Sequence, residues 1–226
     1  MKVASLFSGG KDSAFALWCA QMQGWDVVTL VTVFSESSES WMFHYPATEW
    51  TTLQSEAMRI PRTVIRTKGV KEEELSDLIA GLRGLIKTTG IEGLVSGAVA
   101  SEYQRTRLDN VCEELGIRSF APLWHKNQQQ LVREQIESGF EIMITACNAL
   151  GLTRPWLGRK LDIVSYQELV QLNQKYGLSV AFEGGEAETF VLGAPMFNGR
   201  IQVARSIPHW RNDSGYLELE KLNLIQ

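Results

Sequence analysis

Six residues near the amino terminus combine groups that can hold a phosphate: Ser8-Gly9-Gly10-Lys11-Asp12-Ser13. The glycines leave the backbone open and tolerate positive φ, so N–H groups can converge there on an anion. Lys11 adds a mobile positive charge, and Asp12 or Ser13 can cap a following helix, whose positive end also favours an anion. The spacing is not that of a Walker A loop. The stretch therefore predicts a different phosphate loop, the alternative being a Gly-Gly turn with a solvated lysine.

A second group of reactive side chains lies in Glu183-Gly184-Gly185-Glu186-Ala187-Glu188-Thr189. Three carboxylates around two glycines suit the handling of a metal ion, an ammonium ion or a proton. The alternative is a solvated acidic turn.

Other stretches carry polar or aromatic groups that could meet a ligand. His44 stands in an aromatic segment that either reaches a substrate or folds under its own rings. Arg107 follows Tyr103 by four residues, so on a helix the guanidinium and the ring share one face, the alternative being a helix with solvated arginines. Trp156 lies in a loop rich in functional groups that spans residues 152–159.

The elements that must position these groups alternate between strand and helix. Apolar runs of strand length occupy residues 3–7, 27–34, 63–66, 93–96, 118–123 and 141–150, and helical patterns separate them. This alternation predicts an α/β fold with a doubly wound parallel sheet, in which ligands bind at the carboxyl ends of the strands. After a helix at 166–176, alternating residues at 200–205 and 216–220 predict an antiparallel ribbon. We expect a nucleotide-binding domain at 1–150 and a smaller α+β portion, packed on it, at 151–226.

Composition restricts the function. The 226 residues are 44% hydrophobic and 21% charged, and the formal net charge of −4 argues against bulk nucleic-acid binding. No apolar run reaches the length of a membrane span and no leader precedes the first strand, so we expect a cytoplasmic protein. Cys19, Cys112 and Cys147 are too widely spaced for a metal site with close cysteine pairs, and we expect core packing.

Several of these stretches together resemble one family. The loop looks like the pyrophosphate loop of the N-type ATP pyrophosphatases, whose fold is that of the adenine nucleotide alpha hydrolases. Nearly the whole chain is similar to the diphthine-ammonia ligases in their short archaeal form. The stretches that carry this resemblance are 8–13, Met42-Phe43-His44, Gly97-Ala98 with Tyr103-Gln104 and Arg107, Pro122-Leu123-Trp124, Trp156-Leu157-Gly158-Arg159 and 183–189. The chain departs from the family at Ala187, where an aromatic residue is usual.

The resemblance implies an enzyme that amidates diphthine on translation elongation factor 2 with ammonia and ATP. An acyl-adenylate would form, AMP and pyrophosphate would leave, and Mg²⁺ would arrive with the nucleotide. No protein metal site, membrane or glutaminase module is implied, and a homodimer is expected only if the carboxyl-terminal ribbon exposes an apolar face.

The resemblance also implies roles for residues. The catalytic residues would be Lys11, Asp12 and Glu186. ATP would bind to Ser8, Gly9, Gly10, Lys11, Asp12, Ser13, Phe34 and Gly97. The substrate would meet His44, Tyr103, Gln104, Arg107, Trp124, Trp156, Gly158, Glu183, Gly185, Glu188 and Thr189.

Two other functions remain open on the sequence. One is adenylation of a tRNA base, which strong, salt-dependent binding to tRNA would indicate. The other is an ATP sensor without turnover, which would leave ATP whole.

Overall fold

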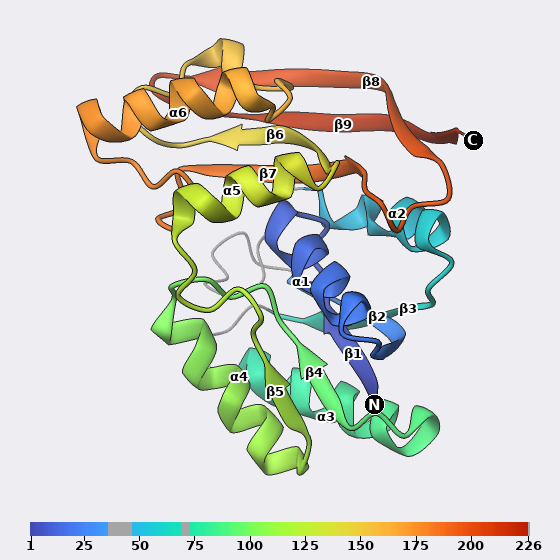
Figure 1. Ribbon diagram of the computed structural model, residues 1–226. Helices are drawn as coiled ribbons and strands as arrows, with labels where there is room; N and C mark the ends of the chain where they lie inside the picture. The colour runs from blue at the N-terminus through green and yellow to red at the C-terminus, as the bar shows by residue number, and fades with distance from the viewer. Residues whose placement is uncertain (36–46, 69–72, 226) are drawn as a thin grey trace. The chain divides into compact units, whose positions relative to one another are not determined.

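The structure, a computed structural model, describes residues 1–35, 47–68 and 73–225 (Figure 1). It divides into two compact units. The first consists of Met1–Ser8, Asp12–Thr51 and Arg59–Trp124, and the second of Gly9–Lys11, Thr52–Met58 and His125–Gln226. The last boundary between the units along the chain lies between residues 124 and 125, whereas the sequence analysis placed the domain boundary between residues 150 and 151.

The first unit is built on a five-stranded parallel sheet with the order β3-β2-β1-β4-β5. Its strands are β1 (Lys2–Leu6), β2 (Asp26–Ser35), β3 (Arg62–Thr67), β4 (Gly93–Val95) and β5 (Arg118–Phe120). The helices of the first 124 residues are α1 (Lys11–Met22), η1 (Thr48–Trp50), α2 (Thr51–Met58), α3 (Glu73–Thr89) and α4 (Glu102–Leu115). The strand order reverses at β1, so right-handed crossovers place helices on both faces. The expected doubly wound sheet is confirmed.

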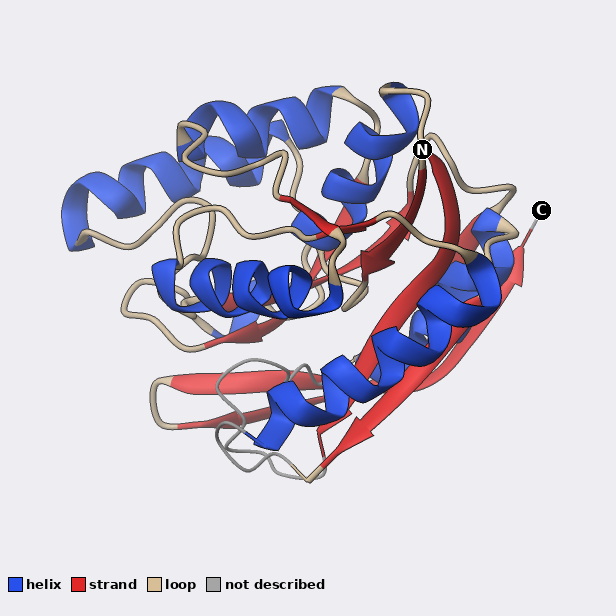
Figure 2. Ribbon diagram, turned by 90° about the horizontal axis from the view of Figure 1, so that it is seen from below, coloured by secondary structure: helices blue, strands red, loops and turns tan. Residues whose placement is uncertain are grey.

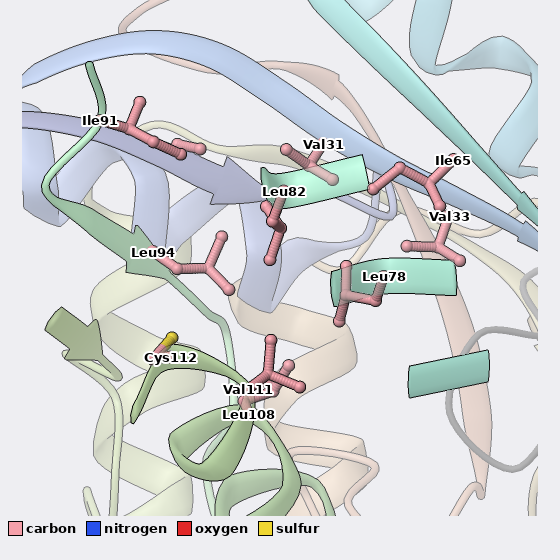
Figure 3. Close-up of a cluster of buried hydrophobic side chains, with 11 residues drawn as sticks. Val31, Val33, Ile65, Leu78, Leu82, Ile91, Leu94, Leu108, Val111 and Cys112 are labelled. Carbon is pink, nitrogen blue, oxygen red and sulfur yellow. The ribbon is translucent and has the colours of Figure 1, made fainter. Parts of the chain in front are cut away.

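Helices α3 and α4 cover one face of this sheet through a cluster of buried apolar side chains (Figure 3). Val31 and Ile65 of the sheet meet Leu78 and Leu82 of α3, and Val111 of α4 completes this layer. Burial of these side chains is the main stabilisation of the unit. The core fixes β1 and β4 as neighbours, with Ser5 opposite Val95. Residues that follow these two strands therefore emerge side by side, at the point where the strand order reverses.

The second unit contains a four-stranded antiparallel sheet with the order β7-β6-β9-β8. Its elements after residue 124 are α5 (Gln128–Glu137), β6 (Glu141–Cys147), η2 (Arg154–Trp156), α6 (Ile163–Tyr176), β7 (Ala187–Gly193), β8 (Arg200–Arg211) and β9 (Ser214–Ile225). Strands β8 and β9 form the expected ribbon, and Figure 2 shows them as a long hairpin with a short connection. Across the described ranges, every helix is too short or too polar to cross a lipid bilayer.

One strand was assigned to the wrong sheet. The sequence analysis counted the run at 141–150 among the parallel strands, but β6 pairs antiparallel with β7 and β9. Residues Ile142 to Cys147 are all buried, and a strand covered on both faces has the same continuous apolar pattern in either kind of sheet. Strand β7 was not expected at all, because it begins inside the acidic segment.

Candidate active site

The amino-terminal loop lies between β1 and α1, as its sequence predicted. Within the first unit, the backbone N–H of Ser8 donates to Ser13 Oγ at 3.3 Å, and the two hydroxyl oxygens are 3.1 Å apart. Gly97 approaches the same turn from the end of β4. A Cβ added to Gly97 would lie 2.7 Å from the backbone carbon of Asp12 and 2.7 Å from the nitrogen of Ser13. Only glycine fits here, so the residues after β1 and β4 form one closely packed backbone surface.

The middle of the loop is bonded to β7 within the second unit. Gly9 has φ 86°, a left-handed conformation that favours glycine. Its carbonyl oxygen accepts hydrogen bonds from the backbone N–H of Val191 at 3.0 Å and from Nε2 of Gln54 at 2.9 Å. The backbone N–H of Lys11 donates to Thr189 Oγ1 at 3.1 Å. Residues 9–11 therefore lie against the strand that carries the end of the acidic segment.

The Lys11 side chain is buried rather than solvated. It is 2% exposed, and its Nζ donates to the carbonyl oxygen of Ala181 at 2.7 Å. The ammonium also lies 5.6 Å from the ring centroid of Phe182, where a cation is attracted by the ring face. The positive charge of the loop thus reaches Ala181 and Phe182, which immediately precede Glu183. Together with the bond from the Lys11 N–H to Thr189, these contacts place Lys11 beside the acidic segment, which is the central feature of the site.

Glu186 holds the acidic segment in its turn. One carboxylate oxygen accepts the backbone N–H of Ser179 at 2.7 Å and the other accepts that of Gly184 at 2.8 Å. Phe182 within this turn has φ 63°, a strained value for a residue other than glycine. The carboxylate thus accepts hydrogen bonds from two backbone N–H groups of the turn. Glu186 is therefore part of the hydrogen bonding of the turn and not merely a solvated acidic side chain.

The remaining acidic residues extend from the same turn. Glu183 is partly buried, and its N–H donates to Ser179 Oγ at 3.1 Å. Glu188 pairs opposite Ala146 in the sheet, and Gly185 has φ 78°. Among the described residues, no three His, Cys, Asp or Glu side chains are arranged to hold a metal ion.

In the first unit, α4 presents a second set of predicted residues. The guanidinium of Arg107 lies 3.6 Å from the ring centroid of Tyr103, which confirms that the two share a face. The N–H of Gln104 donates to Ser101 Oγ at 3.3 Å, which caps the helix. Trp124 lies 5.5 Å from the guanidinium of Arg105, a residue that the sequence analysis did not select.

Phe34 is the next-to-last residue of β2 in the first unit, and the guanidinium groups of two arginines lie near its ring. The distances to the ring centroid are 5.8 Å for Arg62 and 5.7 Å for Arg66. Burial lowers the pKa of Arg62, whose Nη1 donates to Thr51 Oγ1 at 2.6 Å. The expected adenine contact at Phe34 thus lies in a positively charged environment.

Trp156 and Gly158 lie in the second unit. Trp156 is only 5% exposed, and the Arg159 guanidinium lies 4.4 Å from its ring centroid. Arg159 also makes two hydrogen bonds to the Glu168 carboxylate, at 2.6 and 2.5 Å. These bonds raise the pKa of Arg159 and lower that of Glu168. Gly158 has φ 77°, which this turn requires.

Local patterns did not reveal every residue of the site. Gln54 was missed because one glutamine in a helix carries no chemical signature, and Phe182 because positive φ is not encoded by its residue type. His44 lies outside the described residues.

Of the three cysteines, Cys112 and Cys147 are buried free thiols, as expected, and Cys19 is partly exposed. Burial raises the pKa of Cys112 to about 11 and that of Cys147 to about 12, so neither thiol forms a ready nucleophile.

Comparison with known proteins gives matches in both halves of the chain. A family model for the diphthamide synthase N-terminal domain matches residues 1–119, and a model for the C-terminal domain matches residues 127–225. A human protein named diphthine–ammonia ligase is 36% identical over 91% of this chain and 84% of its own length. A fission yeast (Schizosaccharomyces pombe) protein of the same name is 33% identical over 97% of this chain and 39% of its own length.

A solved structure from Methanocaldococcus jannaschii, titled as a predicted subunit of tRNA methyltransferase, covers 86% of this chain and 98% of its own. Its TM-score is 0.47 and its identity 16%, a likeness too low to inform function. The two family models, by contrast, span both units and almost the whole chain. On that match, the chain belongs to the diphthamide synthase family, whose curated members here are carbon–nitrogen ligases named diphthine–ammonia ligase.

Proposed function

We propose that this enzyme amidates the carboxylate of diphthine on elongation factor 2, with ATP and ammonia as co-substrates. The observation that carries the proposal is the bond from Lys11 Nζ to the carbonyl oxygen of Ala181. Lys11 is a cation suited to phosphate, and the segment 183–189 carries carboxylates suited to ammonia. Both belong to the second unit, in which this bond connects Lys11 to the residue two positions before Glu183. The cytoplasm, where elongation factors act, is the compartment that we propose.

The residues of the loop fit a bound nucleotide phosphate. Gly9 has the positive φ that turns backbone N–H groups toward an anion, and Gly97 leaves no side chain over the turn at Asp12 and Ser13. Ser8 and Ser13 add two hydroxyls at the start of α1. Mg²⁺ would come bound to the ATP phosphates and neutralise their charge.

The first chemical step would be attack of a diphthine carboxylate oxygen on the α-phosphorus. The bond from phosphorus to the bridging oxygen breaks, and pyrophosphate leaves with the electron pair. Charge grows on the departing phosphates, and Lys11, whose Nζ donates to the carbonyl oxygen of Ala181, would supply a positive charge to stabilise it. Asp12, in the first turn of α1, would orient the nucleotide with its metal ion.

In the second step, ammonia would attack the activated carbonyl carbon, and AMP would leave with its oxygen. The attacking nitrogen must lose a proton, and a carboxylate is a suitable acceptor. Glu186 is the candidate: each of its oxygens accepts one backbone N–H, and a carboxylate oxygen can accept further donors. The role fails if Glu186→Gln leaves ammonia-dependent turnover intact.

The substrate contacts that the family resemblance implies are proposed here for each unit by itself. In the first unit the candidates are Tyr103, Gln104, Arg107 and Trp124, and in the second they are Trp156, Gly158, Glu183, Gly185, Glu188 and Thr189. The stacked Arg107–Tyr103 pair offers a guanidinium for a carboxylate and a ring for the trimethylammonium group of diphthine.

The test is product analysis with ATP, ammonium and elongation factor 2 arrested at diphthine. We expect release of AMP and pyrophosphate that requires both co-substrates, together with conversion of the carboxylate to an amide in the peptide mass. AMP without a change in the peptide would refute diphthine as the acceptor and leave a tRNA base to be tested. Intact ATP would refute catalysis and favour a sensor.

A further inference from the structure

Gln54 is a completely buried glutamine that contacts the predicted phosphate loop. It lies in α2, is 0% exposed, and belongs with Gly9–Lys11 and β7 to the second unit. Its Nε2 donates to the carbonyl oxygen of Gly9 at 2.9 Å and to that of Val191 at 2.8 Å. Both partners are acceptors, so the NH₂ end of the amide must face them.

The three residues form a closed set of hydrogen bonds. The backbone N–H of Val191 donates to the Gly9 carbonyl oxygen at 3.0 Å, so that oxygen receives two donors. The other end of the Gln54 amide, Oε1, is buried with no hydrogen-bond partner in the part of the chain that the structure describes. An unpaired buried oxygen is unfavourable for stability, which points to another reason for an amide at this position.

We propose that Gln54 is a positioning residue that holds the phosphate loop in its anion-binding conformation. The inference rests on the proposed binding of ATP to this loop. In a planar trans peptide, the carbonyl of Gly9 and the N–H of Gly10 point in opposite directions. Anchoring the carbonyl oxygen on Gln54 and Val191 therefore fixes the Gly10 N–H on the opposite side, the side from which a phosphate would approach.

Glycine at position 9 makes such an anchor necessary. Gly9 has φ 86° and little steric restraint, so the peptide between Gly9 and Gly10 can rotate. A rotated peptide would direct a carbonyl oxygen, instead of an N–H, at the phosphate. The Val191 N–H alone gives one bond, and the Gln54 amide adds a second that also spans to β7.

The decisive variant is Gln54→Met, which keeps the length and burial of the side chain and removes both donors. We expect its KM for ATP and its inhibition constant for pyrophosphate to rise about tenfold, while kcat stays within a factor of about two. That split follows if the loop loses affinity for the phosphates equally in the ground state and the transition state. Binding is also measured without turnover, as the shift in melting temperature on adding ATP or pyrophosphate.

Gln135→Met is the matched control, because Gln135 is also a 0% exposed glutamine and lies in α5, a helix that contains no residue of the loop. We expect it to change the melting temperature without changing the KM for ATP or the pyrophosphate shift. If Gln54→Met behaves as this control does, Gln54 is only structural and the inference is overturned. If the wild-type chain shows no shift with either ligand, the proposed ATP site fails first.

A second variant covers the case in which Gln54→Met does not fold. Gln54→Glu places a carboxylate against two carbonyl oxygens at neutral pH, whereas the protonated acid can donate to one of them. We expect its pyrophosphate shift to recover as the pH falls, with no such recovery in the wild-type chain. A Gln54→Glu protein that binds pyrophosphate as tightly as the wild-type chain at neutral pH would also overturn the inference.

Discussion

The Glu186 carboxylate has a structural task besides the chemical one proposed for it. It accepts the N–H groups of Ser179 and Gly184, which keeps the acidic turn closed. Glu186→Gln turns one of its two acceptors into a donor that faces a backbone N–H. We expect this variant to lose about 1 kcal/mol of unfolding free energy, the usual net contribution of one hydrogen bond, because the two donors are part-buried and exposed, respectively.

Urea denaturation measures this loss. Glu137→Gln is the control, since Glu137 makes an exposed pair with Arg133 and its substitution should leave stability nearly unchanged. A Glu186→Gln protein as stable as the wild-type chain would show that the carboxylate does not hold the turn.

The buried thiol of Cys147 makes stability depend on alkaline pH. Burial raises its pKa to about 12 from an ordinary value of 9.0. In that interval the folded chain keeps the proton and the unfolded chain loses it, so stability falls as pH rises. We expect Cys147→Ala to remove a slope of at most about 1.4 kcal/mol per pH unit, measured by urea denaturation at neutral and alkaline pH. The same slope in Cys147→Ala and the wild-type chain would contradict this assignment.

Among the elements, α6 begins with a reciprocal cap that ties its stability to pH. Asp162 Oδ1 accepts the N–H of Ser165 at 2.9 Å, and Ser165 Oγ accepts the N–H of Asp162 at 2.8 Å. The backbone hydrogen bond from Ser165 lowers the pKa of Asp162. The stabilisation from this carboxylate is therefore present at neutral pH, and it is lost as the pH falls below the ordinary carboxyl pKa and through the lowered pKa of the folded chain.

Two variants distinguish the effect of the capping hydrogen bond on stability from that of the negative charge of Asp162. We expect Asp162→Ala to lose about 1 kcal/mol at neutral pH, and Asp162→Asn to lose less because an amide oxygen also caps a helix. Thermal unfolding at neutral and acidic pH should show a smaller acid loss for Asp162→Asn than for the wild-type chain. Equal acid losses would mean that Asp162 does not carry this dependence.

Elements were more predictable than their pairing. The strand-to-helix transition at Ser8–Ser13 and the period of β8 and β9 are local patterns, and both were confirmed. The sheet to which β6 belongs could not be predicted from its local sequence, because a continuous apolar run fits a parallel or an antiparallel sheet. The Gln54 amide joins residues 45 and 137 positions away, and no spacing within one helix encodes that contact. The phosphate loop and the acidic segment could be predicted from residue types and the amidation from the family resemblance, whereas the supporting contacts required the fold.

At the scale of the whole molecule, the second unit is not one continuous piece of chain. It needs Gly9–Lys11 and Thr52–Met58 in addition to the residues from His125 onward. Strand β7 lies at the edge of its sheet, and Val191 on that edge bonds to Gly9 and Gln54. Asn198 after β7 donates from its N–H and its side chain to the carbonyl oxygen of Ala57. The early segments therefore cover an edge that would otherwise be open to association.

A fragment of residues 125–226 should consequently fold poorly alone. We expect weak amide dispersion in its NMR spectrum and self-association on gel filtration, because the β7 edge and the Asn198 donors lose their partners. Co-expression with residues 1–124 is the control, since that piece supplies both early segments and should restore a dispersed spectrum. If the fragment alone unfolds cooperatively with the midpoint of the full chain, the early segments are dispensable for the sheet. Their bonds to β7 would then serve the loop rather than the fold, which is the outcome that would strengthen the role inferred for Gln54.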